Sequence, residues 1–130
     1  MDFSALNDSS SYTYDQLIES PEVVLMFWTS QCMYCRRELE KLNKLGLEQL
    51  PVPIFFVNLG ESRRAIEAFL KDMKINPDIK EKVVMDPDLF FVRNFGVLGV
   101  PTYFFFADKE IVYKSYRLSP ETVKGVFVHE

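Results

Sequence analysis

Two cysteines, Cys32 and Cys35, form the pattern C-x-x-C and are the only cysteines in the 130-residue chain. They directly follow an apolar run, residues 23–28, and they open a segment with a helical pattern of apolar residues. A strand that delivers two thiols to a helix N-terminus is typical of sites for dithiol–disulfide exchange. The spacing therefore predicts a disulfide that closes within one helical turn and opens again.

The positions of the two thiols predict different roles. The first backbone N–H groups of a helix lack intrahelical partners and carry partial positive charge, so they would stabilise a thiolate at Cys32. Cys35 stands one turn further into the helix, where we expect it to be more buried and to stay protonated. Cys32 is then predicted to attack a substrate disulfide, and Cys35 to attack Cys32 and release the reduced substrate.

Two structural roles compete with this chemistry. A structural disulfide between cysteines this close would restrict the unfolded chain very little. A zinc site would find only half of its four ligands in the two cysteines. The single histidine, His129, stands near the C-terminus, where we expect it to be exposed and without a ligand set. The spacing therefore favours redox chemistry.

The cysteines lie between a predicted central strand and a predicted helix. Residues 23–28 are apolar on both faces, which suits a sheet covered on both sides. Residues 33–45 place leucines at steps of three among charged residues, and Gly46 is a plausible end for this helix. A second buried strand is predicted at residues 54–57, followed by a helix that Ser62 caps. The inner face of that helix comprises Ile66, Phe69, Leu70 and Met73.

The flanking segments are less regular. Residues 1–20 are polar and predict a hairpin or an extended lead-in. Residues 76–78 are predicted to break the helical pattern, and residues 83–85 are a short strand candidate. The next helix is predicted to begin near Pro87 or Asp88.

The chain is predicted to end in a β-hairpin and a helix. Residues 103–106 and 111–113 flank a turn, and Ser119 precedes Pro120, an arrangement typical of a helix start. The order β-α-β-α-β-α-β-β-α predicts an α/β fold, with a central mixed sheet flanked by helices on both faces. Because no repeat or linker interrupts the chain, residues 1–130 are predicted to form a single domain.

Composition and charge narrow the classes of function. Hydrophobic residues make up 48% of the chain, enough for a core that needs neither metal nor disulfide staples. A net charge of −4 argues against a nucleic-acid interface, which would need a clustered basic face. No apolar run reaches the roughly 18 residues that a membrane span needs. The N-terminal residues lack a signal-peptide pattern, which leaves a cytosolic protein, or an exported one without its leader or anchor, both open.

Several motifs together resemble the thioredoxin superfamily. Phe27 and Trp28 precede the C-x-x-C motif, and Val100-Pro101-Thr102 follows about 65 residues after it. Within the superfamily, the chain is most similar to the TlpA/ResA-like thiol–disulfide oxidoreductases. The motifs that carry this similarity are Cys35-Arg36-Arg37-Glu38, Val57-Asn58-Leu59-Gly60-Glu61-Ser62 and Met85-Asp86-Pro87-Asp88. The resemblance covers nearly the whole chain and implies the thioredoxin fold.

The resemblance also implies how a substrate would be held. It implies a cis peptide bond between Val100 and Pro101, beside the disulfide. The Val100 backbone would pair with an extended substrate segment, and Pro101, which has no N–H, would offer no donor there. The residues expected at the substrate are Trp28, Met33, Tyr34, Val100 and Pro101. Among these, Trp28 is expected to wall the site and shield the disulfide.

The chain departs from thioredoxin around the motif, and the departures bear on proton handling. Met26 stands where thioredoxin has a buried aspartate that relays protons, and Gln31 replaces a tryptophan. Met33 and Tyr34 replace the Gly-Pro pair between the cysteines. Because this pair tunes the thiolate, the sequence does not assign the redox potential. Glu38 is the predicted proton acceptor.

Two arguments favour Glu38, which lies three residues past Cys35 on the same helical face. It matches a functional acid of the TlpA/ResA branch, and poor solvation would suit it to proton transfer. A plain solvated helix residue is the alternative.

The leading hypothesis is a thiol–disulfide oxidoreductase that reduces protein disulfides, with Cys32, Cys35 and Glu38 as catalytic residues. Protein disulfides and an upstream dithiol donor are the expected partners of a monomer whose only redox group is its own disulfide. The resemblance further implies an extracytoplasmic setting and a part in cell redox homeostasis. Two alternatives remain: a non-catalytic peptide-binding module of the same fold, for which Met26 and Gln31 leave room, and a disulfide oxidase or isomerase.

Overall fold

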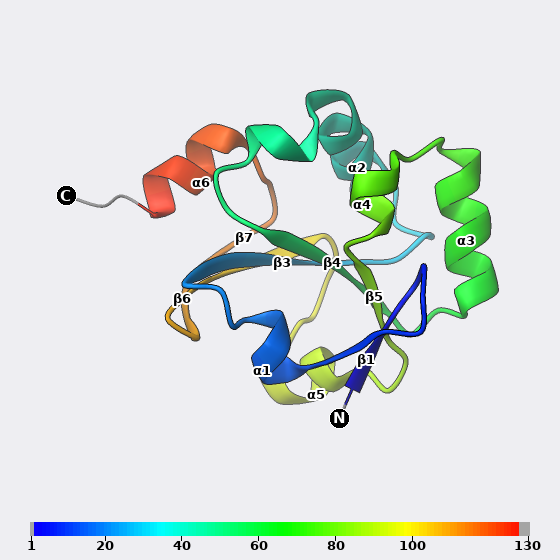
Figure 1. Cartoon of the computed structure of the whole chain (residues 1–130), viewed down its shortest axis with the longest axis horizontal. Coiled ribbons are helices and arrows are strands. Elements are labelled where there is room, and N and C mark those ends of the chain that lie inside the picture. The colour runs from blue at the N-terminus through cyan, green and yellow to red at the C-terminus, as the bar shows by residue number, and fades with distance from the viewer. Residues whose placement is uncertain (1, 128–130) are drawn as a thin grey trace.

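A computed structural model describes residues 2–127, which form a seven-stranded mixed sheet in the order β2-β1-β5-β4-β3-β6-β7 (Figure 1). The strands are β1 (Asp2–Ala5), β2 (Ser11–Thr13), β3 (Glu22–Trp28), β4 (Ile54–Leu59), β5 (Val83–Asp86), β6 (Thr102–Ala107) and β7 (Glu110–Ser115). The helices are α1 (Tyr14–Leu17), α2 (Met33–Leu45), the 3-10 turn η1 (Leu47–Gln49), α3 (Arg63–Asp72), α4 (Pro77–Lys80), α5 (Phe90–Phe95) and α6 (Pro120–Val126). His129 lies outside the described residues.

The strand that leads to the cysteines is the centre of the sheet. β3 pairs in parallel with β4 on one side and antiparallel with β6 on the other. Its side chains from Val23 to Trp28 are all buried. A strand that is paired on both edges and covered on both faces has no side chain in contact with water. Its sequence is therefore continuously hydrophobic. The predicted central strand is confirmed.

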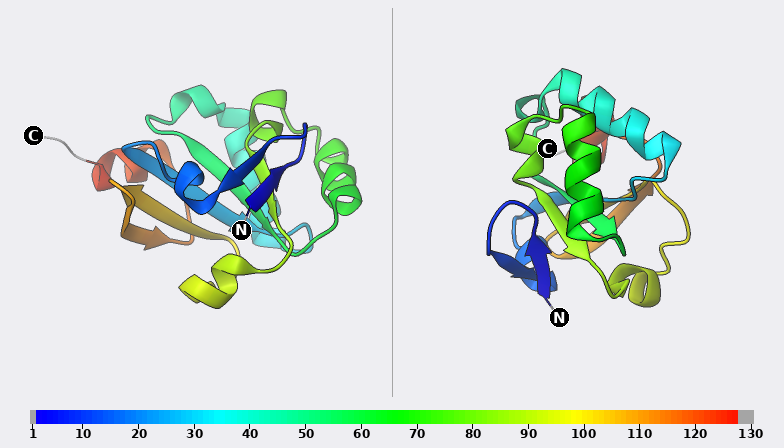
Figure 2. Two further views of the ribbon diagram at one scale, coloured as in Figure 1. Left: turned by 60° about the horizontal axis from the view of Figure 1, so that its bottom comes forward. Right: turned by 90° about the vertical axis from the view of Figure 1, so that its right-hand side faces the viewer.

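Each face of the sheet carries its own helices (Figures 1 and 2). α2, α3, α4 and α6 cover one face, into which α2 sends Leu39 and Leu42. The short helices α1 and α5 cover the other face, where Leu17 and Phe91 pack. The predicted mixed sheet with helices on both faces is therefore confirmed.

Antiparallel hairpins lie at both edges of the sheet. At one edge, β6 and β7 pair as predicted, with Tyr103 opposite Ser115. At the other edge, β1 and β2 form the hairpin alternative of the predicted lead-in. β1 also pairs with β5, with Ser4 opposite Met85, so the N-terminal segment extends the sheet rather than preceding it.

Two predicted boundaries were wrong. The predicted break at residues 76–78 instead starts α4, because a proline at the first helical position fits where no N–H partner is needed. α5 begins at Phe90 rather than near Pro87 or Asp88. The Asp86 carboxylate accepts hydrogen bonds from the N–H groups of Phe90 and Phe91 at 2.9 and 3.1 Å, so the side chain that caps α5 comes from the end of β5.

Candidate active site

Cys32 occupies the N-cap of α2, in the short connection that follows β3. Its Sγ accepts a hydrogen bond from the backbone N–H of Cys35 at 3.0 Å. The same sulfur donates to the carbonyl oxygen of Val100 at 3.4 Å. The Val100–Pro101 peptide bond is cis. The first thiol therefore stands between the unpaired N–H groups of a helix N-terminus and a loop 68 residues away in the chain.

The two thiols differ in exposure. Both are free, and Cys32 is partly exposed whereas Cys35 is fully buried. Burial, and next the hydrogen bond with Cys32, raise the pKa of the Cys35 thiol well above its usual value. The predicted burial of Cys35 is confirmed, and its thiol is protonated at neutral pH.

The loop before Cys32 is tied to the end of β4. The Glu61 carboxylate accepts hydrogen bonds from the backbone N–H of Ser30, at 2.6 Å, and from its hydroxyl. Asn58 holds Glu61 in place: its side-chain amide donates to that carboxylate at 2.8 Å, and its oxygen accepts the Glu61 N–H at 3.1 Å. This clamp positions the loop that presents Cys32.

Glu38 is neither exposed nor free. One carboxylate oxygen accepts hydrogen bonds from the Tyr103 hydroxyl at 2.8 Å and from the Leu118 N–H at 3.0 Å. The other lies 2.8 Å from the Lys41 ammonium, and the Glu38 side chain is only 13% exposed. Glu38 thus joins α2 to β6 and to the segment before α6.

Tyr103 links this carboxylate electrostatically to the buried thiol. Burial raises the pKa of the Tyr103 hydroxyl well above its usual value, followed by the charge of Glu38 and the hydrogen bond to it. The charge of Cys35 raises it further. The hydroxyl is therefore protonated at neutral pH and donates to Glu38.

The other predicted site residues take different places. Trp28 is fully buried, with its ring centre 5.5 Å from that of Phe69, which suits a wall behind the thiols. Its Nε1 is buried without a hydrogen-bond partner among the described residues. Met33 and Tyr34, in contrast, are 66% and 67% exposed on the first turn of α2.

A cavity of about 380 Å³ lies beside the cis proline, and we call it the Pro101 groove. Its lining residues are Tyr34, Arg37, Glu38, Val100, Pro101, Tyr116 and Arg117. Four of the predicted site residues are thus brought together in one depression: Tyr34, Glu38, Val100 and Pro101. Met33 does not line it.

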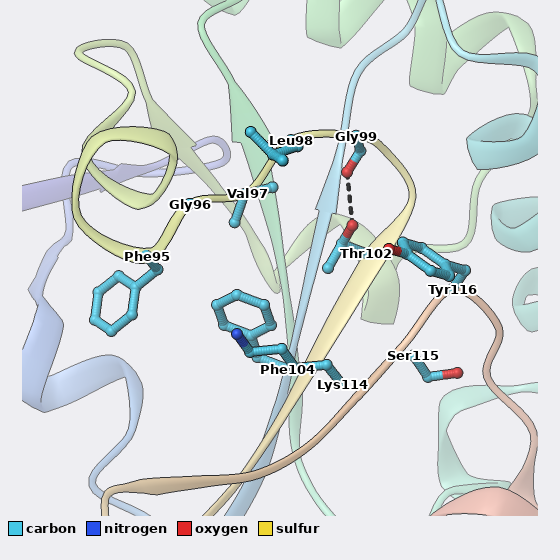
Figure 3. A pocket seen from close by; sticks show the side chains of 10 residues that line it. All are labelled: Phe95, Gly96, Val97, Leu98, Gly99, Thr102, Phe104, Lys114, Ser115 and Tyr116. Atoms are coloured by element: carbon cyan, nitrogen blue, oxygen red, sulfur yellow. Dashed lines mark hydrogen bonds between the residues drawn. The ribbon is translucent and has the colours of Figure 1, made fainter.

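A second cavity, of about 250 Å³, adjoins the groove through Tyr116 (Figure 3). It is bounded by the loop that follows α5 and by β7. The Thr102 hydroxyl donates to the Gly99 carbonyl oxygen at 2.6 Å across the turn that contains Pro101. Tyr116 is 73% exposed, so the two cavities flank a prominent aromatic side chain.

Reasoning from sequence missed several of these residues. Tyr103 carried a signal: a hydroxyl within an otherwise phenylalanine run in a buried strand needs a partner. Glu61 carried no signal for this role, because its contact with Ser30 spans 31 residues. Tyr116 and Arg117 carried no signal, since only the fold brings them to Pro101.

Residues 2–127 contain neither a cluster of metal ligands nor a membrane-spanning helix. In that range, no three histidine, cysteine, aspartate or glutamate side chains are grouped so that they could hold a metal ion. Over the same residues, no helix is long and apolar enough to cross a membrane.

Comparison with known families decides the relationship. A family model described as the AhpC/TSA family matches residues 1–115. The chain belongs to the AhpC/TSA family. Among curated relatives, this family member is 29% identical over 84 residues to the thiol-disulfide oxidoreductase ResA of Bacillus thuringiensis subsp. konkukian, and equally to that of Bacillus cereus. Each match covers 63% of this chain and 46% of the relative, so the chain spans about half the length of these relatives.

Solved structures share the fold of this AhpC/TSA family member. StoA from Bacillus subtilis superposes with a TM-score of 0.74 at 20% identity, over 97% of this chain and 94% of StoA. The thioredoxin domain of a thiol-disulfide oxidoreductase from Bacteroides vulgatus gives 0.75 at 18% identity, over 96% and 91% of the two chains. These matches confirm the thioredoxin fold, and with the ResA relatives they confirm the predicted TlpA/ResA-like resemblance.

Proposed function

We propose that this chain is a thiol–disulfide oxidoreductase that reduces protein disulfides through Cys32 and Cys35. One observation carries the proposal: an accessible thiol at a helix N-cap, with a buried, protonated thiol one turn behind it. The kinship with ResA, which is named a thiol-disulfide oxidoreductase, supports the same chemistry.

The proposed reaction moves two electrons. The Cys32 thiolate attacks one sulfur of the substrate disulfide, and a mixed disulfide forms while the first substrate thiolate leaves and takes a proton. Cys35 then gives up its proton and attacks the Cys32 sulfur. That step breaks the mixed disulfide, releases the second substrate thiol and leaves a Cys32–Cys35 disulfide. An upstream dithiol donor is proposed to reduce this disulfide and complete the cycle.

Glu38 is proposed to receive the Cys35 proton. Its carboxylate accepts a hydrogen bond from the Tyr103 hydroxyl, which lies in the same core as Cys35. The first-turn residues Met33 and Tyr34, together with Val100 and Pro101, are proposed to contact the substrate. Trp28 is proposed to shield the thiols from behind.

Reduction of insulin in the presence of dithiothreitol tests the chemistry. The parent should accelerate precipitation of the insulin chains, and Cys32→Ala should fall to the uncatalysed rate, because no thiol remains to attack. Reduced Cys35→Ala, mixed with insulin after dithiothreitol has been removed, should instead accumulate a covalent mixed disulfide with the substrate, visible by mass. Equal background rates for the parent and Cys32→Ala would leave a peptide-binding module as the better account.

The midpoint potential of the Cys32–Cys35 couple tests the direction. The reducing direction rests on the resemblance to the TlpA/ResA branch. A potential near the roughly −270 mV of thioredoxin would support it, whereas a value near the roughly −120 mV of a strong disulfide oxidant would assign the chain to the oxidases.

A further inference from the structure

Two exposed aromatic side chains line the Pro101 groove. Tyr34, on the first turn of α2, is 67% exposed, and Tyr116, after β7, is 73% exposed. Both line the groove together with Pro101. Exposed large side chains gathered around one depression are typical of surfaces that bind a partner.

Two arginines line the same groove and have no carboxylate partner in residues 2–127. The Arg37 guanidinium lies over Tyr34, 5.6 Å from the ring centre, and contacts the Met33 sulfur at 3.8 Å. Arg117 is exposed, and only its backbone atoms make hydrogen bonds, both with Ser115. No ion pair involving either guanidinium occurs among the described residues.

The acid in the groove does not offset these charges. Glu38 lines the groove, but its oxygens are bound by Tyr103, Leu118 and Lys41. The Lys41 ammonium balances its charge at 2.8 Å. The two arginines therefore leave the groove positive, although the chain as a whole carries a net charge of −4.

We propose that the Pro101 groove selects disulfide substrates in which an acidic residue, Asp or Glu, stands beside the cysteine that Cys32 attacks. The selection rests on the proposed function and names the class of substrate segment. The guanidiniums of Arg37 and Arg117 pair with the acidic side chain, while Tyr34 and Tyr116 flank the backbone of the segment. Unpaired arginines are well suited to this task because the planar guanidinium binds carboxylates through two N–H groups.

The expected preference is modest because the groove is open to solvent. Exposed ion pairs are weak individually, so two arginines should give an acidic segment a roughly three- to tenfold higher kcat/KM than a basic one. The preference should shrink toward one at high salt, which screens exposed charges.

Two synthetic peptides serve as probes for the full chain. They share one sequence with a single cysteine, held as a mixed disulfide with thionitrobenzoate, and differ only in the flanking residues, glutamate in one and lysine in the other. Release of thionitrobenzoate by the reduced protein reports kcat/KM for each peptide. The parent should favour the glutamate peptide, and Arg117→Glu should remove or reverse that preference.

Lys109→Glu is the matched control. It makes the same change in net charge on the exposed turn between β6 and β7, at the end of β6 opposite Pro101. It should keep the preference of the parent within about twofold, because the charge lies more than a Debye length from the groove. Arg117→Gln, which removes the charge without reversing it, should give an intermediate preference.

Each outcome has one meaning. A glutamate preference that Arg117→Glu abolishes and Lys109→Glu retains supports the selection. Equal rates for both peptides in the parent, or equal effects of the two charge reversals, overturn it while leaving the oxidoreductase function in place. No release from either peptide overturns the proposed function itself, and the selection falls with it.

Discussion

The central strands β3 and β6 contribute side chains to both faces of the sheet, and the two faces bury different kinds of residue. On the face covered by α2, which we call the thiol face, β3 and β6 place Met26 and Tyr103 in one core with Cys35. On the opposite face, which we call the aromatic face, they place Phe27 and Phe104. Because side chains alternate along a strand, residues next to each other in sequence serve different purposes.

The aromatic face is packed mainly by aromatic and aliphatic side chains. The buried residues of its cluster are all apolar, and the ring of Phe91 lies at their centre. Its centroid is 4.8 Å from that of Phe27, 5.2 Å from Phe3 and 5.6 Å from Phe95. Such a face stabilises the fold through buried area and ring packing.

The thiol face buries polar groups that need specific partners. Tyr103 and Glu38 satisfy one another, whereas the Trp28 Nε1 has no partner in the described part of the chain. Cys35 lies in the same core as a protonated thiol. The aromatic face thus stabilises the fold, while the thiol face carries the buried polar groups of the site. Substitutions on the aromatic face should lower the free energy of unfolding, and substitutions on the thiol face should also change turnover.

Phe91→Ala should have the largest effect on stability. Truncating a fully buried phenylalanine removes apolar burial and leaves a cavity, so we expect a loss of roughly 3–5 kcal/mol in the free energy of unfolding. Insulin reduction per folded molecule should be unchanged, since the thiol face is untouched. Urea unfolding and turnover below the transition measure the two quantities; a loss of turnover equal to that of a site variant would show that the faces are not independent.

Glu38→Ala should come next, at roughly 2–4 kcal/mol. It leaves the buried Tyr103 hydroxyl and the Leu118 N–H without an acceptor, and each buried unpaired donor costs roughly 1–3 kcal/mol. Urea unfolding of this variant beside the parent measures the loss. A cost below that of an ordinary surface substitution would show that water replaces both partners.

Glu38→Gln separates the structural part of Glu38 from a chemical one. The amide oxygen can still accept from Tyr103 and Leu118, so stability should fall by only about 1 kcal/mol. The rate of insulin reduction should fall, and its pH profile should change, because an amide cannot take the Cys35 proton. An unchanged profile would limit Glu38 to positioning Tyr103 and the start of α6.

The smallest expected effect is on the free energy of unfolding at alkaline pH, where the Cys35 thiol titrates. The folded pKa of Cys35 lies above its unfolded value of 9.0, so the native state binds this proton more tightly. Its contribution to stability is complete below that unfolded value and is lost as the pH rises toward the folded one. Between about pH 8 and about pH 10, the reduced parent should lose roughly 1 kcal/mol more than Cys35→Ala does.

Urea unfolding at the two pH values, under reducing conditions, measures this difference. Tyr103 is present in both proteins, and burial, the largest cause of its raised pKa, acts in both, so most of its contribution cancels in the comparison. The absolute cost of Cys35→Ala cancels in the same way. Parallel pH dependence in the two proteins would mean that burial of the thiol has no thermodynamic consequence.

Much of the framework could be predicted from local pattern. The apolar run before Cys32, the leucine spacing after it and Ser62 or Ser119 at helix starts each specify their own element. The predictions went wrong at two helix starts, those of α4 and α5. Asp86 at the end of β5 caps α5, and that placed the helix start at Phe90.

The sequence by itself determined the pair of thiols, their place between a buried strand and a helix, and the alternation that divides the two faces. These depend on spacings of two to four residues, which strand and helix periods set directly. The tertiary structure alone decided that Val100 meets Cys32, that Tyr103 and Leu118 hold Glu38, and that Arg117 joins Arg37 at Pro101. Those groups are far apart in the chain, and only strand order and register bring them together.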